Sequence, residues 1–196
     1  MKKRIVRMIS VLLFVSLIAC EDIFISPLPQ QEENQYITHY LIEKGAHDAN
    51  QLPSLKEKIS ELKFQAKFDS TAIYTSQKAN NQADINKLYG LSDCNSLHQV
   101  NSARFGWRWY NGQLQILAYT YNNKVRDFKI IGTASINAYH QYKIEFTATS
   151  YIFTLDNNTV TLPRNCSGKA SGYKLYPYFG GDEVAPHDVS IWIKDL

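Results

Sequence analysis

The chain has few cysteines and none of the short motifs that mark the large nucleotide-, metal- and serine-dependent enzyme classes. Only three of its 196 residues are cysteines, and no two of them form a CxxC pair. A zinc site of the ribbon or finger type is therefore not expected, since its ligands come in closely spaced pairs. P-loop, nucleophile-elbow, HExxH and dinucleotide-binding patterns are also absent. We expect no bound cofactor.

The chain also lacks a hydrophobic run long enough for a transmembrane helix, which needs about 20 apolar residues. Its one apolar run, residues 8–19, follows four basic residues and is broken only by two serines. This arrangement is typical of an export signal. Residues 17–20, Leu-Ile-Ala-Cys, resemble the lipobox of bacterial lipoprotein precursors. The resemblance implies cleavage before Cys20 and lipidation of its thiol; the alternative is an ordinary signal peptide with a cysteine near its end.

A basic surface is missing once this segment is removed. Residues 1–19 hold four of the 21 basic residues and none of the 18 acidic ones, so the formal net charge changes from +3 to −1. Binding to nucleic-acid phosphates needs clustered Lys and Arg side chains. We therefore expect no nucleic-acid partner.

The chain divides into three parts. Residues 1–19 are the predicted signal peptide, residues 20–35 the lipidated cysteine with a polar tether, and residues 36–196 a single β-sandwich domain. Glu21 and Asp22 resemble the acidic signals that send some Gram-negative lipoproteins to the cell surface. We expect an exported outer-membrane lipoprotein, held to the membrane by its lipid and facing either the periplasm or the outside.

The residues after the tether are rich in tyrosine and arranged in short alternating segments, which favours strands. Ser102–Trp109 has one face of alanine and aromatic residues, and Asn111-Gly112 is typical of a two-residue hairpin turn leading into residues 113–121. The other expected strands cover residues 36–42, 62–68, 128–131, 140–148, 151–155, 159–162 and 189–193, whereas residues 53–62 are expected to form a short helix or a loop and residues 76–87 a loop.

Two segments carry a resemblance to a known fold. Residues 101–109, NSARFGWRW, with the Gly-Gln-Leu at residues 112–114, resemble a strand pair of concanavalin A-like jelly rolls of the alginate- and glucuronan-lyase type. Residues 178–188, YFGGDEVAPHD, resemble the stretch before the last strand of those folds. The resemblance implies an all-β, concanavalin A-like jelly-roll β-sandwich, but it carries over no complete catalytic motif. The wider chain resembles uncharacterised bacterial surface lipoproteins.

Two cysteines remain after Cys20 is assigned to the lipid. In an exported protein, Cys94 and Cys166 are expected to form one disulfide. Neither has a histidine or a further cysteine at the spacing of a metal ligand.

Arg104 and Arg108 lie on the polar face of the expected strand, about 13 Å apart along it. Gly106 between them leaves room for a ligand to approach the backbone. The pair predicts a groove for uronate carboxylates or sugar hydroxyls. The alternative is that each arginine pairs with an acidic side chain on the outer face of the sheet.

Tyr173, Tyr176 and Tyr178 are candidate ligand-binding residues, because sugars stack on aromatic rings; the alternative is that these rings pack in the core. A polysaccharide lyase would also need a base and a group that neutralises the uronate carboxylate. The candidates for that set are His98, Arg104, Arg108 and Tyr176, with the alternative that His98 is an ordinary loop histidine.

Asp182, Glu183 and Asp188 are candidates for a calcium site; the alternative is a turn capped by aspartate. Three functions remain open. The first is a glycan-binding lipoprotein without catalysis. The second is a small lyase acting on a uronate-containing polysaccharide. The third is an accessory subunit docked on an outer-membrane protein complex.

Overall fold

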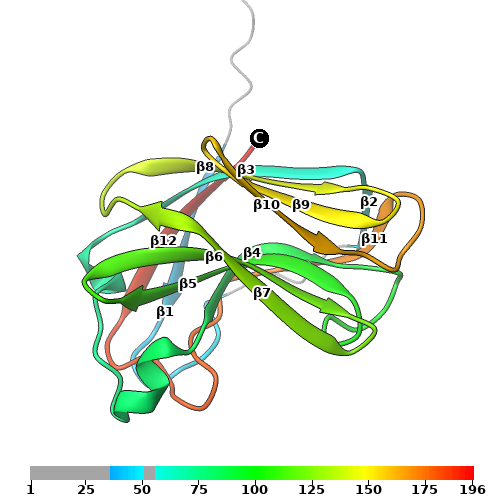
Figure 1. The fold of residues 1–196 in the computed structure, drawn as a ribbon. Coiled ribbons are helices and arrows are strands. Elements are labelled where there is room, and N and C mark those ends of the chain that lie inside the picture. The colour runs from blue at the N-terminus through cyan, green and yellow to red at the C-terminus, as the bar shows by residue number, and fades with distance from the viewer. Residues whose placement is uncertain (1–35, 51–55) are drawn as a thin grey trace, which may run out of the picture. The chain divides into compact units, whose positions relative to one another are not determined.

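The computed structural model describes residues 36–50 and 56–196, which form two packed sheets (Figure 1). Cys20 and its predicted lipobox lie outside the described residues. Twelve strands and two short 3₁₀ helices, but no α-helix, are found in this part of the chain. None of its helices is long and apolar enough to cross a membrane. The all-β jelly-roll prediction is confirmed.

The first sheet has six antiparallel strands in the order β1-β12-β3-β8-β9-β10. Its strands are β1 (Ile37–Ile42), β3 (Glu61–Phe68), β8 (Tyr139–Phe146), β9 (Ser150–Leu155), β10 (Asn158–Pro163) and β12 (Val189–Asp195).

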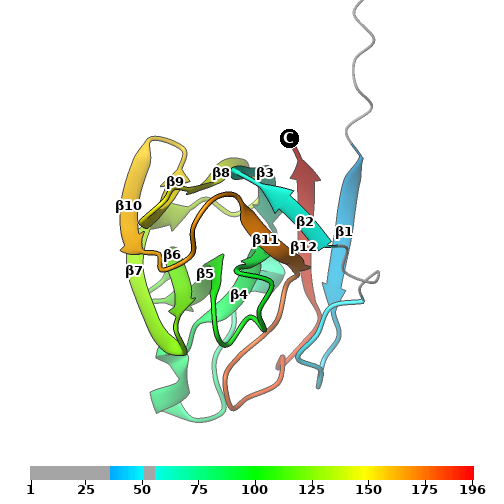
Figure 2. The same cartoon turned by 90° about the vertical axis from the view of Figure 1, so that its right-hand side faces the viewer.

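The second sheet has the order β2-β11-β4-β5-β6-β7, and Figure 2 shows β11 lying between β2 and β4. Its strands are β2 (Lys56–Ile59), β4 (Asn86–Ser92), β5 (Ser102–Tyr110), β6 (Gln113–Asn122), β7 (Val125–Ala134) and β11 (Ala170–Leu175). The 3₁₀ helices are η1 (Ser70–Ala72) and η2 (Ala79–Ala83).

Side-chain alternation along β5 decides what faces the core. Phe105 and Trp107 are fully buried between the sheets, where the Phe105 ring lies 5.0 Å from the ring of Tyr142 in the first sheet. Because successive side chains of a strand point to opposite faces, Arg104 and Arg108 lie on the face turned away from this core. The predicted division of β5 into two faces is therefore confirmed.

The Asn111-Gly112 turn sets the register of the β5–β6 hairpin. Both residues have positive φ angles, 53° and 72°, as a two-residue hairpin turn of this type requires. The register places Arg104 opposite Tyr119. This pairing brings a tyrosine of β6 beside the arginine of β5.

Three strands of the second sheet differ from the sequence-based expectation. The expected helix or loop at residues 53–62 contains β2, and β4 and β11 were not predicted. Gly90 and Gly172, which resemble turn signals, lie inside these two strands because the backbones approach closely there. A Cβ on Gly90 would lie 2.2 Å from the Ala103 carbonyl oxygen, and one on Gly172 would lie 2.2 Å from the Ser92 hydroxyl.

Candidate functional site

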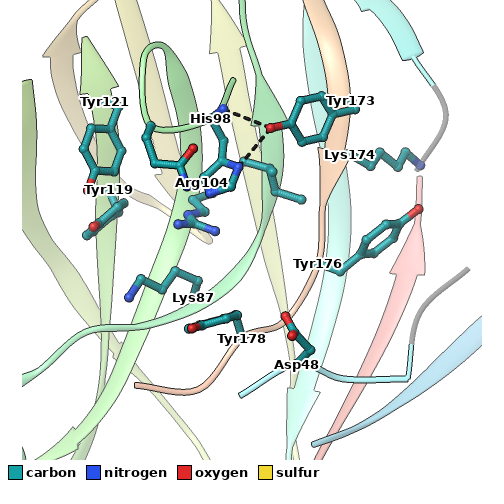
Figure 3. A pocket seen from close by; sticks show the side chains of 12 residues that line it. Asp48, Lys87, His98, Arg104, Tyr119, Tyr121, Tyr173, Lys174, Tyr176 and Tyr178 are labelled. Carbon is teal, nitrogen blue, oxygen red and sulfur yellow. Dashed lines mark hydrogen bonds between the residues drawn. The ribbon is translucent and has the colours of Figure 1, made fainter. Parts of the chain in front are cut away.

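A pocket of about 480 Å³ opens on the face of the second sheet that is turned away from the core (Figure 3). We call it the tyrosine pocket, because five of its twelve lining residues are tyrosines. Five of the predicted site residues line it: His98, Arg104, Tyr173, Tyr176 and Tyr178. Its other lining residues are Asp48, Lys87, Gln99, Tyr119, Tyr121, Lys174 and Leu175.

Arg104 is a buried cation without a counter-ion. Its side chain projects from β5 into the pocket, yet the residue is only 8% exposed. Among the described residues it forms no ion pair, and its Nε is buried without a hydrogen-bond partner. Its guanidinium carbon lies 5.4 Å from the centre of the Tyr119 ring. Since a buried charge is costly unless it is paired, this group favours an incoming anion.

Lys87 of β4 places a second cation beside Arg104. Its ammonium group donates a hydrogen bond to the Gly180 carbonyl, 2.7 Å away, and lies 5.6 Å from the rings of Tyr119 and Tyr178. Burial and the nearby Arg104 lower the pKa of Lys87 to about 8. The amine therefore remains mostly protonated at neutral pH but loses its charge in mildly alkaline solution.

His98 and Tyr173 form a hydrogen-bonded pair at the edge of the pocket. The His98 backbone N–H donates to the Tyr173 hydroxyl over 3.0 Å, and the same hydroxyl lies 2.9 Å from His98 Nδ1. Burial lowers the pKa of His98, and the charges of Arg104 and Lys87 lower it further. A neutral imidazole can accept the hydroxyl proton, so the pair has the composition of a proton-transfer couple.

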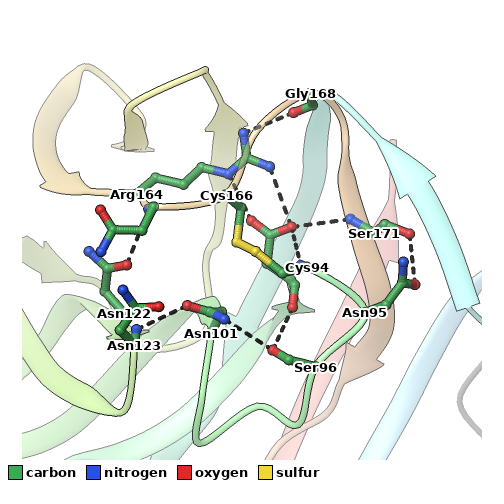
Figure 4. The surroundings of a disulfide bond; sticks show 12 residues. Cys94, Asn95, Ser96, Asn101, Asn122, Asn123, Arg164, Cys166, Gly168 and Ser171 are labelled. Carbon is green, nitrogen blue, oxygen red and sulfur yellow. Dashed lines mark hydrogen bonds and ion pairs between the residues drawn. A yellow bond between two sulfur atoms is a disulfide. The ribbon is translucent and has the colours of Figure 1, made fainter.

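A clamp made of a disulfide and a buried ion pair lies at the start of the loop that carries His98, and Figure 4 shows the surroundings of the disulfide. Cys94 and Cys166 form the predicted disulfide, with their Cα atoms 5.7 Å apart. Next to it, the carboxylate of Asp93 accepts a hydrogen bond from Arg164 Nε at 2.7 Å and one from the Tyr151 hydroxyl at 3.1 Å. The clamp therefore sets the position of one wall of the pocket.

The other end of the pocket has a different charge. Lys174 binds the carboxylates of Asp195 and Glu57, at 2.9 and 3.3 Å, so its charge is balanced by the protein. Asp48 is exposed, and its carboxylate forms no hydrogen bond or ion pair with the described residues. This end therefore presents the Asp48 carboxylate, next to Tyr178 and without a partner among the described residues.

Arg108 lies outside the pocket, so the expectation of one groove shared with Arg104 was wrong. Its Nη1 donates to the Ala83 carbonyl at 2.6 Å, and its Nε donates to the Gln115 side chain at 2.8 Å. The physical reason is the short helix η2, whose last residue supplies the carbonyl acceptor at this end of β5. Two N–H groups of this guanidinium thus donate to neutral acceptors of the protein.

Two of the three acidic residues proposed for calcium, Glu183 and Asp188, hold loops. Glu183 accepts hydrogen bonds from the backbone N–H groups of Gln77 and Lys78, both at 2.8 Å, and Asp188 accepts one from the backbone of Lys44 at 2.8 Å. In the described ranges these carboxylates and Asp182 form no group with metal-ligand geometry. The turn-forming alternative therefore accounts for Glu183 and Asp188.

Four residues of the pocket were not predicted from the sequence: Lys87, Asp48, Tyr119 and Tyr121. A signal for the tyrosines was present, because the Asn111-Gly112 turn sets the hairpin register that brings both opposite the Arg104 strand. Lys87 and Asp48 gave no local signal. They reach the pocket through bridges to Tyr178, which is far from both in the sequence.

Comparison with family models gives no match, and no curated protein sequence is similar to the chain. Solved structures with a similar fold include the alginate lyase from Klebsiella pneumoniae, with a TM-score of 0.51 and 12% identity over 68% of this chain. A glycoside hydrolase family 16 endo-glucanase from Bacteroides ovatus has a TM-score of 0.54 and 12% identity over 85% of this chain and 83% of its own.

The alginate lyase AlyC3 is also similar, with a TM-score of 0.52 and 9% identity over 80% of this chain and 71% of its own. The chain spans only 56% of the length of the Klebsiella enzyme. Structural similarity at such low sequence identity is evidence for the fold alone. The described chain has the concanavalin A-like jelly-roll fold that is found in alginate lyases and family 16 glucanases.

Proposed function

We propose that this protein binds an acidic polysaccharide in the tyrosine pocket, with a uronate carboxylate held by Arg104 and Lys87. The observation that carries the proposal is the buried Arg104 guanidinium, which has no counter-ion among the described residues. A carboxylate ligand would supply the missing charge and accept hydrogen bonds in the planar geometry that guanidinium favours. The surrounding tyrosines offer rings and hydroxyls to neighbouring sugars.

The fold is consistent with this proposal. The similar structures named above are enzymes described as alginate lyases and an endo-glucanase, and all act on polysaccharides. A jelly roll hosts many functions, so the pocket, rather than the fold, supports binding of an acidic polysaccharide.

The test is calorimetric titration of oligouronates into the wild type and into Arg104→Met. Removing the guanidinium is expected to weaken binding about tenfold or more, because a hydrogen-bonded charge is lost. Arg108→Met is the matched control: it removes the same group from the same strand face but outside the pocket, and it should leave affinity unchanged. Equal affinity of wild type and Arg104→Met would overturn the proposal.

A second candidate function, uronate lyase activity, is favoured by the His98–Tyr173 pair. In a β-elimination, a base removes the proton beside the carboxylate, an acid protonates the leaving glycosidic oxygen, and a carbon–carbon double bond forms. Neutral His98 and Tyr173 have suitable groups for the two proton transfers, and Arg104 would neutralise the carboxylate. Ultraviolet absorbance of unsaturated ends, lost in Tyr173→Phe but with binding retained, would establish catalysis; binding without product would support a purely binding role.

We also propose that the protein is anchored to the membrane through a lipid on Cys20. The support is the lipobox-like sequence at residues 17–20 and the basic and apolar segments before it. Cys20→Ala should move the protein out of the membrane fraction and abolish labelling by fatty acid. Unchanged membrane retention would contradict the anchor, and would favour docking on a membrane protein complex.

A further inference from the structure

The tyrosine pocket has two ends of opposite charge, and this polarity points to a particular class of polysaccharide. Lys87 and Arg104 lie at one end, whereas Asp48 lies at the other, with Tyr178 between them (Figure 3). A ligand that fills the pocket therefore contacts two cations at one end and one anion at the other.

The backbone places these groups in a row. Tyr178 forms antiparallel bridges with Lys87 on one side and with Asp48 on the other. Neighbouring strands lie about 4.8 Å apart, so the backbones of Lys87 and Asp48 are separated by about 10 Å. That distance is wider than one sugar ring, so two consecutive sugars would occupy the two ends.

Asp48 does not serve as the counter-ion of the cations. It forms no ion pair with Lys87 or Arg104 within the described ranges, and the acidic group that raises the pKa of Lys87 is Asp84. Lys174, which lies on the same side of the pocket, is already bound to Glu57 and Asp195. The Asp48 carboxylate thus faces the pocket as an acceptor for the ligand.

We infer that the pocket selects a heteropolymer in which a uronate alternates with an uncharged, hydrogen-bond-donating sugar. The inference rests on the proposed function and adds the identity of the second sugar. The uronate lies on Arg104 and Lys87, and a hydroxyl or amide N–H of its neighbour donates to Asp48. A polymer of uronates alone would bring a second carboxylate beside Asp48, and the two like charges would repel each other.

The test compares two probes of equal length: oligosaccharides that alternate glucuronate with N-acetylglucosamine, and oligoguluronate. The wild type is expected to bind the alternating probe about tenfold more tightly, in line with a charged hydrogen bond gained and a repulsion avoided. Asp48→Asn removes the negative charge while keeping the shape of the side chain. It should strengthen binding of oligoguluronate several-fold, weaken binding of the alternating probe, and so abolish the preference.

Asp182→Asn is the matched control, because Asp182 is exposed and does not line the pocket. It should leave both affinities unchanged. Equal wild-type affinity for the two probes, or an equal gain for both in Asp48→Asn, would overturn the inference. Binding of oligoguluronate that is lost in Arg104→Met would still support the proposed function, whereas binding of neither probe would count against the proposed function itself.

Discussion

At the scale of single residues, Lys87 is the group that makes the pocket sensitive to pH. Burial and the neighbouring Arg104 lower its pKa to about 8, from an ordinary value of 10.5. An acidic ligand prefers the protonated amine, so affinity should decline as the pH rises through about 8. The decline can be measured by calorimetric titration of an oligouronate at pH values from about 1.5 units below this pKa to about 1.5 units above it.

Stability should change in the opposite direction over the same interval. Between pH 8 and the unfolded value of 10.5, the unfolded chain holds more protons at this lysine than the folded chain does. The contribution of Lys87 to folding therefore grows with pH, and loss of affinity cannot be ascribed to unfolding. Lys87→Arg keeps the charge throughout and should flatten the binding profile. An unchanged decline in Lys87→Arg would show that another group is responsible.

At the scale of strands, the part of the site that could be predicted is the β5–β6 hairpin. Alternation of polar and apolar residues gave the two faces of β5, and the Asn111-Gly112 turn contained the register that pairs Arg104 with Tyr119. Local sequence was sufficient because both the strand period and the turn are local properties.

Two further strands carry parts of the site, β4 with Lys87 and β11 with Tyr173, and local patterns did not reveal either strand. Gly90 and Gly172 resemble turn signals in the sequence, but they allow two backbones to approach closely, which depends on a partner far along the chain. Arg108 illustrates the same limit. Its place in the strand pattern matches that of Arg104, yet it donates a hydrogen bond to the carbonyl of Ala83 and does not line the pocket.

The buried Arg164–Asp93 pair of the clamp should contribute strongly to the free energy of unfolding. Arg164 and Asp93 have side-chain exposures of 0% and 1%, so Arg164→Met would leave a carboxylate buried and without its cation. Losing one partner of such a pair is expected to lower the free energy of unfolding by about 3–5 kcal/mol. Urea unfolding measures the change.

A surface pair provides the contrast. Lys63 and Glu61 are each 45% exposed, so Lys63→Met should cost less than about 1 kcal/mol, because solvent screens the pair. If the two variants lose equal stability, the Arg164–Asp93 pair is no more than a surface-like contact, and the clamp does not hold the loop.

At the scale of the whole molecule, the Cys94–Cys166 disulfide joins the two sheets at one end of the sandwich. Cys94 follows β4 of the second sheet, and Cys166 lies in the connection that runs from β10 of the first sheet to β11 of the second. The cysteines are 72 positions apart in the sequence. Closing a loop of this length restricts the unfolded chain and stabilises the fold by about 4 kcal/mol on the chain-entropy model.

The double variant Cys94→Ala/Cys166→Ala should therefore unfold at a lower urea concentration, with a free energy of unfolding lower by about 4 kcal/mol. Because the disulfide also holds the loop that presents His98 to Tyr173, we expect the folded variant to bind oligouronates more weakly. Adding a reductant to the wild type should reproduce both effects, and adding it to the variant should change neither.

Equal unfolding curves for wild type and variant would show that the sandwich does not depend on the bond. Unchanged affinity at lower stability would show that the pocket does not depend on the disulfide, because the His98 loop would then keep its position through the Arg164–Asp93 pair alone.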